Sequence, residues 1–128
     1  MHKDRKNTED LPLFKKGKEI MEVVQKIIEL IPDDNEHLQH TKSQMFSDAA
    51  LLTVKIPGAE SGGLYDIKME AATIIRKATN DLMIQYHALE MFGFKELEYF
   101  NIVRELLEEY RLQFIDWVLN FDKWVNIL

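Results

Sequence analysis

Four long segments of this sequence carry apolar residues at steps of three and four, the spacing that lines one face of an α-helix. No segment of comparable length shows the alternation of apolar and polar residues that is typical of a half-buried strand. We therefore predict an all-α chain, with helices over four ranges: about Asp10 to Pro32, the following turn to about Lys55, Ile67 to Gly93, and about Glu96 to Asp122 or beyond.

The predicted helix ends depend on an aspartate, two prolines and a glycine. Asp10 is expected to cap the first helix, because a carboxylate there accepts hydrogen bonds from free backbone N–H groups, and Pro12 suits a first turn. Pro32 ends this helix, since proline cannot continue the hydrogen-bonding pattern. Gly93 predicts the C-terminal cap of the third helix and a tight antiparallel return.

One proline and three glycines gather between the second and third helices: Pro57, Gly58, Gly62 and Gly63. This cluster is expected to end the second helix near Lys55 and to link it to the third. The alternative is a proline kink within a longer second helix.

Length and composition suit one globular domain. The 128 residues are 46% hydrophobic and 30% charged, which is unlike a disordered chain. Residues 1–9 are predicted to form a flexible polar leader, and residues 10–128 a single domain. Helices of similar length with short connections pack side by side. The predicted fold is an antiparallel up-and-down four-helix bundle.

Several classes of protein are excluded. The chain has no cysteine, which excludes a disulfide framework, a thiolate metal site and a thiol nucleophile. No apolar run approaches the roughly 18 residues of a membrane span, and the first ten residues are too polar for a signal peptide. We expect a cytoplasmic protein without membrane contact.

The polar residues do not form a recognisable catalytic or metal-binding set. His37 and His40 lie three residues apart beside Asp33 and Asp34, so one helix face and the preceding turn could hold a divalent metal ion. A solvated helix start is favoured instead, because zinc sites show a third and fourth ligand at recognisable spacing. We predict that the protein is not an enzyme and holds no cofactor or metal ion.

The charge balance bears on nucleic-acid binding. The net charge is -6, which disfavours attraction to polyphosphate. The basic residues gather weakly near the N-terminus, where residues 1–20 carry six basic and four acidic side chains. The candidate nucleic-acid contacts are Lys15, Lys16, Lys18 and Lys42.

Aromatic residues are concentrated in the last part of the chain, where nine of the 13 follow residue 91. A helix of a monomeric bundle needs only one buried stripe, and these side chains broaden it. Because exposed apolar patches usually mark interfaces, we predict self-association, with a wide core stripe as the alternative. The predicted interface residues are Tyr99, Tyr110, Phe114, Trp117, Phe121 and Trp124.

Three stretches of the sequence carry a family resemblance: Leu11–Gly17 (LPLFKKG), Ile56–Gly62 (IPGAESG) and Asp81–Phe94 (DLMIQYHALEMFGF). They resemble four-helix bundle proteins related to the 23S ribosomal RNA intervening-sequence proteins and, more distantly, the accessory proteins of diversity-generating retroelements. The resemblance implies a non-enzymatic interaction protein, a homopentamer, and a connection with nucleic acid.

The sequence departs from that family at the positions of its cations. Phe46-Ser47-Asp48 stands where the family carries an arginine pair, and the short stretch Gly63–Asp66 replaces a basic loop. A phosphate-binding surface would need its cations there. The leading expectation is therefore a non-enzymatic, homo-oligomeric binding or scaffolding protein. The alternative is a ribonucleoprotein or nucleic-acid accessory protein.

Overall fold

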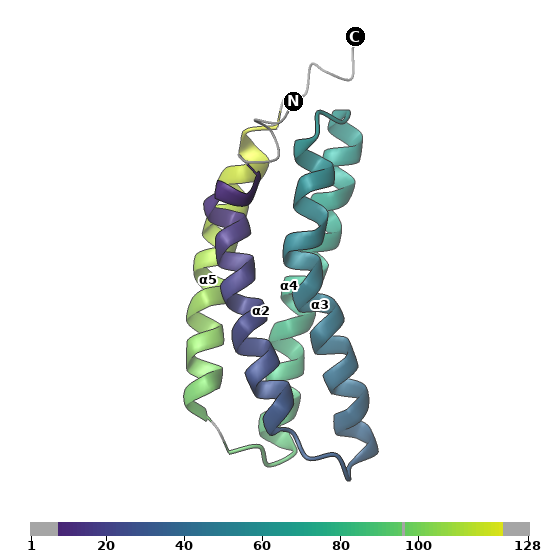
Figure 1. Ribbon diagram of the computed structural model, residues 1–128, viewed down its shortest axis with the longest axis vertical. Helices are drawn as coiled ribbons and strands as arrows, with labels where there is room; N and C mark the ends of the chain where they lie inside the picture. The colour runs from purple at the N-terminus through teal and green to yellow at the C-terminus, as the bar shows by residue number, and fades with distance from the viewer. Residues whose placement is uncertain (1–7, 96, 122–128) are drawn as a thin grey trace.

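The protein folds as an antiparallel up-and-down four-helix bundle. The structure is a computed structural model, and it describes residues 8–95 and 97–121. The helices are α2 (Pro12–Leu30), α3 (Glu36–Glu60), α4 (Tyr65–Met91) and α5 (Leu97–Leu119). They alternate in direction and are joined by short connections, so α2 begins and α5 ends at the same end of the bundle (Figure 1). The predicted fold class is confirmed, and no strand occurs within the described ranges.

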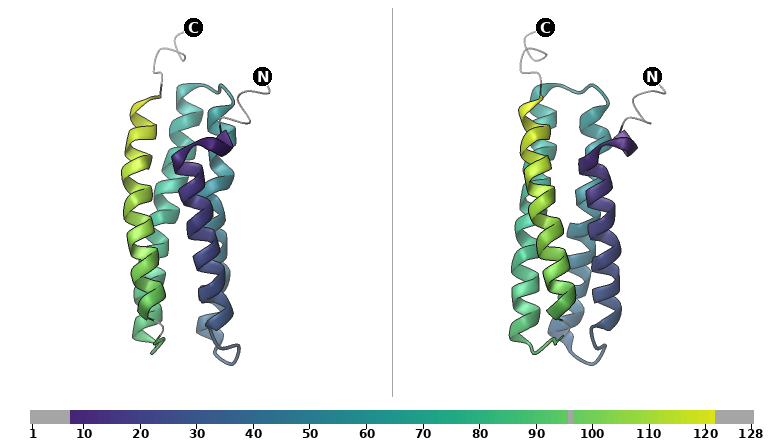
Figure 2. Two further views of the ribbon diagram at one scale, coloured as in Figure 1. Left: turned by 60° about the vertical axis from the view of Figure 1, so that its left-hand side comes forward. Right: turned by 90° about the vertical axis from the view of Figure 1, so that its left-hand side faces the viewer.

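Each helix packs on its neighbours around a single core (Figure 2). Helix α2 contacts α3 and α5, and α3 contacts α4, whereas α4 and α5 contact each other least. The core side chains follow the three- and four-residue spacing of the sequence. Fully buried examples are Ile20, Val24, Ile27, Met45, Leu52, Ile75, Leu82, Leu89 and Val103. Ile67 is an exception. It begins the apolar stripe predicted for the third helix, but it is half-exposed at the start of α4.

The first helix begins differently from the prediction. Leu11 occupies the N-cap position of α2 and makes no side-chain capping bond, and Pro12 is the first helical residue. The cap predicted at Asp10 is therefore wrong. Residues 8–10 form a helical turn of their own, and the Leu11 backbone N–H donates to the Thr8 carbonyl at 3.2 Å. Thr8 is buried, so the fold begins before the predicted boundary at residue 10. Residues 1–7 of the predicted leader lie outside the described residues.

Helix α3 continues through the proline that was expected to end it. Asn35 caps its start, where the side-chain Oδ1 accepts from the backbone N–H of His37 at 3.0 Å and of Leu38 at 3.3 Å. Pro57 lies inside the helix, which ends only at Glu60. A proline removes one backbone donor and is tolerated where packing maintains the helix. The buried residues Ile56 and Ala59 on either side of Pro57 supply that packing.

The return between α4 and α5 follows the prediction at Gly93. The Phe94 N–H donates to the Leu89 carbonyl and the Gly93 N–H to the Glu90 carbonyl, both at 3.1 Å. This pair of bonds is the Schellman motif, which needs a left-handed residue after the helix. Gly93 provides it with a φ of 85°. The part of the predicted fourth helix beyond Phe121 lies outside the described residues.

Helix α2 passes close to α3 at Gly17. A Cβ atom on Gly17 would lie 2.8 Å from Thr53 Cγ2 and 2.9 Å from the Leu52 carbonyl oxygen. Both distances are too short for real contacts, and the second involves backbone that cannot move aside. Glycine at this position therefore lets the two helices pack closely.

We predict that Gly17→Ala destabilises the bundle by about 1–2 kcal/mol. Overpacking a core costs about 1–3 kcal/mol, and part of this is offset by the higher helix propensity of alanine. Chemical denaturation measures the change. The matched control is Gly58→Ala in α3, because a Cβ there meets no atom within 4 Å. This control should gain up to about 1 kcal/mol. Equal gains in both variants would contradict the close approach.

Candidate interaction surface between α4 and α5

The seam between α4 and α5 is closed at one end and open at the other. At the closed end the Tyr86 ring meets the Phe100 ring edge-on, with centroids 5.5 Å apart. Toward the other end the seam widens into a groove of about 460 Å³. The α4 wall there carries the polar residues Arg76, Thr79 and Asn80, which do not fill the space against the larger side chains of α5. The groove is further lined by Tyr110, Arg111, Phe114, Ile115, Val118 and Leu119.

An apolar ridge on α5 borders this groove. It consists of Leu112, Ile115 and Leu119, with 57%, 43% and 77% of each residue exposed to solvent. Their spacing of three and four places them side by side on one outer face of the helix. Single exposed apolar residues are ordinary, whereas a contiguous group beside a groove is typical of an interaction surface. We name Leu112, Ile115 and Leu119 the α5 ridge.

Charged side chains of both signs accompany the ridge and the groove. Arg76 makes no ion pair or hydrogen bond with another residue in the described ranges. The Arg111 Nη2 lies 3.0 Å from Glu108 Oε1, and this hydrogen bond lowers the pKa of the Glu108 carboxyl. Asp116 follows the ridge residue Ile115 and is exposed. The groove is thus cationic on one wall, and acidic side chains stand beside the ridge.

The aromatic residues predicted to form an interface lie mostly against the core. Tyr110 is fully buried and Trp117 is 8% exposed, so neither offers much surface to a second molecule. Tyr99, Phe114 and Phe121 are partly buried and pack against the core. The wide core stripe therefore accounts for most of this set, and Trp124 lies outside the described residues. Sequence reasoning missed the α5 ridge, although its spacing beside the aromatic stripe was a usable signal.

Two buried aromatic side chains of α5 bond directly to α3. The Tyr110 hydroxyl donates to the Leu52 carbonyl at 2.8 Å, and Trp117 Nε1 donates to the Glu60 carboxylate. Burial raises the pKa of Tyr110 well above its usual value, so this hydroxyl keeps its proton. Both bonds cross the interior between helices that are not neighbours in the bundle.

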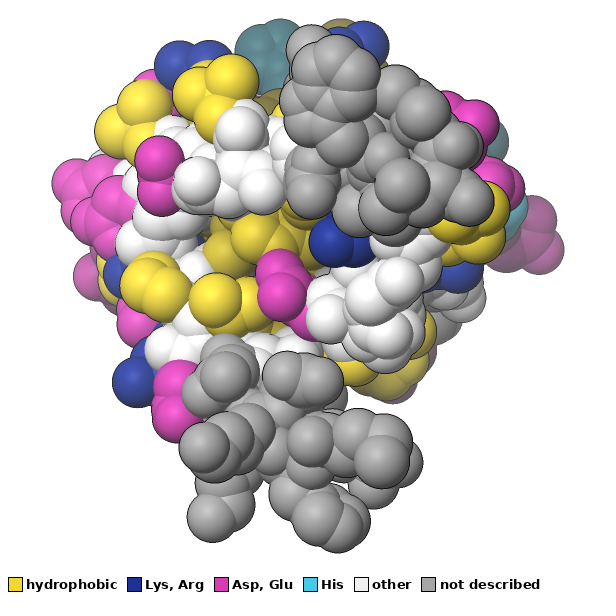
Figure 3. Space-filling model, turned by 90° about the horizontal axis from the view of Figure 1, so that it is seen from above, with side chains coloured by type: hydrophobic (Ala, Val, Ile, Leu, Met, Phe, Trp, Pro, Cys, Tyr) yellow, Lys and Arg dark blue, Asp and Glu magenta, His cyan; other side chains and the backbone are white. Residues whose placement is uncertain are grey.

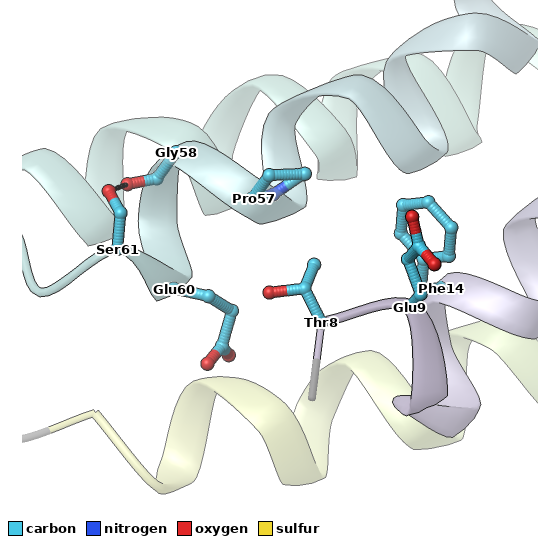
Figure 4. Close-up of a pocket in the computed structure, with 7 residues that line it drawn as sticks. All are labelled: Thr8, Glu9, Phe14, Pro57, Gly58, Glu60 and Ser61. Atoms are coloured by element: carbon cyan, nitrogen blue, oxygen red, sulfur yellow. Dashed lines mark hydrogen bonds between the residues drawn. The ribbon is translucent and has the colours of Figure 1, made fainter. Parts of the chain in front are cut away.

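A second cavity, of about 450 Å³, opens at the end of the bundle where α3 finishes. Its lining residues are Thr8, Glu9, Phe14, Pro57, Gly58, Glu60 and Ser61 (Figure 4). The Ser61 hydroxyl donates to the Gly58 carbonyl at 2.9 Å, and Glu60 accepts from Trp117. Both side chains therefore help to hold this end together. From this end of the bundle, apolar side chains show near the centre of the face with an acidic side chain beside them (Figure 3).

The four lysines predicted to contact nucleic acid do not form one surface. Lys16 Nζ lies 2.6 Å from Glu109 Oε2 and 3.4 Å from Glu19 Oε2, and the bond to Glu109 raises the pKa of Lys16. Lys18 Nζ lies 5.7 Å from the centre of the Phe14 ring. Lys15, Lys16 and Lys18 belong to the start of α2, whereas Lys42 is near the start of α3, at the opposite end of the bundle. There Lys42 Nζ lies 2.7 Å from Asp33 Oδ1.

The histidines considered for metal binding lie at the exposed start of α3. The His37 ring stacks on the Phe92 ring, with centroids 5.9 Å apart, and His40 is exposed. Among the described residues, no group of three or more His, Asp or Glu side chains is placed to hold a metal ion. Nor does any helix in the described ranges have the length and apolar character to cross a membrane.

Comparison with protein-family models, with curated proteins and with solved structures finds no match to this chain. The family resemblance therefore rests on the sequence motifs alone. What is established is an all-helical protein with four main helices in the described part of the chain.

We predict that Tyr110→Phe lowers the free energy of unfolding by about 1 kcal/mol. The change removes one buried hydrogen bond and keeps the ring, and such bonds contribute about 0.5–1.5 kcal/mol. Thermal or chemical unfolding measures the loss. Tyr65→Phe is the matched control, because the Tyr65 hydroxyl bonds to no residue in the described ranges. If the two variants unfold alike, the Tyr110 bond contributes nothing to stability.

Proposed function

We propose that this protein is a non-enzymatic binding or scaffolding module that assembles with further copies of itself through the seam between α4 and α5. The single observation that carries the proposal is the exposed α5 ridge beside the groove. Leaving Leu112, Ile115 and Leu119 in water is unfavourable, since burial of apolar surface contributes about 25 cal/mol per Å². A partner that covers them recovers this free energy.

Charge complementarity favours a second copy of the chain as the occupant. The groove carries Arg76, which is unpaired among the described residues, whereas Arg111 is already paired with Glu108 of its own chain. The ridge that would enter it is bordered by the exposed Asp116. One copy thus offers both the cationic groove and an apolar ridge with an acidic neighbour. The ridge of one copy can therefore enter the groove of the next, a head-to-tail contact that can close into a ring of identical chains.

The resemblance to the intervening-sequence proteins supports a specific number of copies for the proposed assembly. It implies a homopentamer, in which each bundle would contact two others. A non-enzymatic role also agrees with the contacts at the end of the bundle where α3 finishes. There the side chains of Ser61 and Glu60 form hydrogen bonds within the fold.

Size-exclusion chromatography with light scattering tests the assembly. We expect a mass that is a multiple of 15.1 kDa for the wild type at micromolar concentration. The double variant Leu112→Glu and Leu119→Glu should raise the dissociation constant at least tenfold, about 1.4 kcal/mol, because it places charges on the apolar ridge. Its circular dichroism should remain that of a folded bundle, since both residues are largely exposed.

The matched control is Val54→Glu in α3. Val54 is 65% exposed and lies on the helix diagonal to α5, so its replacement should leave the mass unchanged. A wild-type protein that elutes as a 15.1 kDa monomer would overturn the proposed assembly. If the ridge variant and the Val54→Glu control dissociate to the same extent, the assembly does not use the seam between α4 and α5.

The second candidate is the nucleic-acid role that the resemblance implies. It is supported by Lys15, which is exposed and makes no ion pair with another described residue, and by the neighbouring Lys18. Lys16 and Lys42 support it less, because each is held by a carboxylate within the fold.

We predict that any RNA binding is weak, weakens as salt rises, and is lost in the double variant Lys15→Glu and Lys18→Glu. An electrophoretic mobility shift with a single-stranded RNA at low salt measures it. The control is Lys55→Glu, because Lys55 lines a groove between α3 and α4 and does not belong to α2. No shift with the wild-type protein at low salt would remove this candidate.

A further inference from the structure

A polar pair joins α3 and α4 at the edge of the core, beside a groove between the two helices. Gln85 Nε2 donates to Asp48 Oδ2 at 2.8 Å. Gln85 is only 9% exposed and lies on the core stripe of α4, one turn from the fully buried Leu82 and Leu89. The amide therefore occupies a position that an apolar residue would normally take.

Only half of this amide is satisfied. Gln85 Oε1 has less than 1 Å² of accessible surface and accepts no hydrogen bond. A buried carbonyl without a donor is destabilising, because it has lost its hydrogen bonds to water. Bulk solvent hardly reaches this oxygen, and the nearest side chain that could become a donor is the one that the amide already contacts. Asp48 is already hydrogen-bonded to the same amide.

The protonation state of Asp48 decides whether it can be that donor. An ionised carboxylate only accepts hydrogen bonds, whereas a carboxylic acid has one O–H to donate. We propose that Asp48 takes up a proton and donates it in a hydrogen bond to Gln85 Oε1, so that the pair acts as a proton-operated clasp between α3 and α4. A protonated pair makes two hydrogen bonds and carries no buried charge.

The surroundings of Asp48 favour the protonated form. Burial raises the pKa of Asp48, the negative charge of Asp81 raises it further, and the hydrogen bond from Gln85 and the positive charge of Lys77 oppose this rise. Lys77 is drawn toward Asp81, with Nζ 2.7 Å from Asp81 Oδ2. The uncharged residues beside Asp48 in the same groove on α3 are Ser43, Gln44 and Ser47.

The sign of the pH effect follows from the direction of the shift. The pKa of Asp48 in the folded protein lies above 3.8, the usual value of an aspartate side chain. Its stabilising contribution is therefore complete below pH 3.8 and is lost as the pH rises through the folded value. Over this weakly acidic range the clasp strengthens the contact between α3 and α4 as the pH falls.

Asp48→Asn tests the clasp, because the introduced amide supplies an N–H donor at every pH and cannot titrate. We expect this variant to raise the Tm near pH 7 by about 3–5 °C, and to match the wild type below pH 3.8. The control Asp34→Asn removes the same charge from an exposed turn before α3 and should leave the Tm unchanged in both pH ranges. A lower Tm for Asp48→Asn near pH 7 would overturn the proposal.

NMR titration of the wild-type protein gives a readout that does not depend on a variant. The Asp48 carboxyl carbon should titrate with a midpoint above 3.8, and the side-chain amide signals of Gln85 should shift with the same midpoint. Because Gln85 Nε2 already donates to Asp48 Oδ2, the amide protons follow the charge of Asp48 in any case, so the discriminating signal is the side-chain carbonyl carbon of Gln85, which moves downfield when Oε1 gains a donor. Titration of Asp48 at or below 3.8, or a Gln85 carbonyl carbon that does not move downfield as Asp48 is protonated, would refute the clasp.

Discussion

Three helices of the bundle meet at one backbone carbonyl, that of Leu52 in α3. From one side Gly17 of α2 comes so close that a Cβ atom would lie 2.9 Å from this oxygen. From another side the Tyr110 hydroxyl of α5 donates to it at 2.8 Å. Apolar stripes alone allow helices to slide and rotate with little cost. The close contact at Gly17, which has no side chain, fixes α2 against α3, and the directional hydrogen bond from Tyr110 fixes α5 against α3.

The open seam follows from this arrangement. Helix α5 is attached to the bundle through its packing on α2 and through the bonds from Tyr110 and Trp117 to α3. It meets α4 where Tyr86 packs on Phe100 and where Arg104 Nη2 lies 3.7 Å from Glu90 Oε1. The remaining part of the seam is lined on α4 by polar residues and is left as a groove. The surface that suits assembly is thus the contact that the fold itself uses least.

Charge and hydrogen bonding also separate the two proposed roles. Two of the lysines that could contact phosphate are neutralised by carboxylates of the same chain, and Lys42 lies at the far end from the other three. Arg76 instead stands unpaired among the described residues, beside an apolar groove. The balance of these contacts favours a protein partner of the same kind over a polyphosphate. Gln85, with its unsatisfied oxygen, adds a proton-dependent element to the opposite face of α4.

The sequence by itself determined the helical class, the number of long helices and most of the core. These depend on side chains three and four residues apart, a relation contained in the local sequence. The core residues of all four helices follow this spacing, and Gly93 ends its helix as the local sequence predicts. The predicted cap at Asp10 fails because the helix starts at Pro12 without a side-chain cap.

Only the tertiary structure decided three further features. Pro57 remains inside α3 because Ile56 and Ala59 are buried against other helices, and this packing outweighs one lost hydrogen bond. Tyr110 and Trp117 turn inward because α3 offers them acceptors, while the α5 ridge stays exposed on the outer face of the same helix. Local spacing states which residues share a face of a helix, but what lies opposite that face is set by residues more than 50 positions away, as with Leu52 and Tyr110.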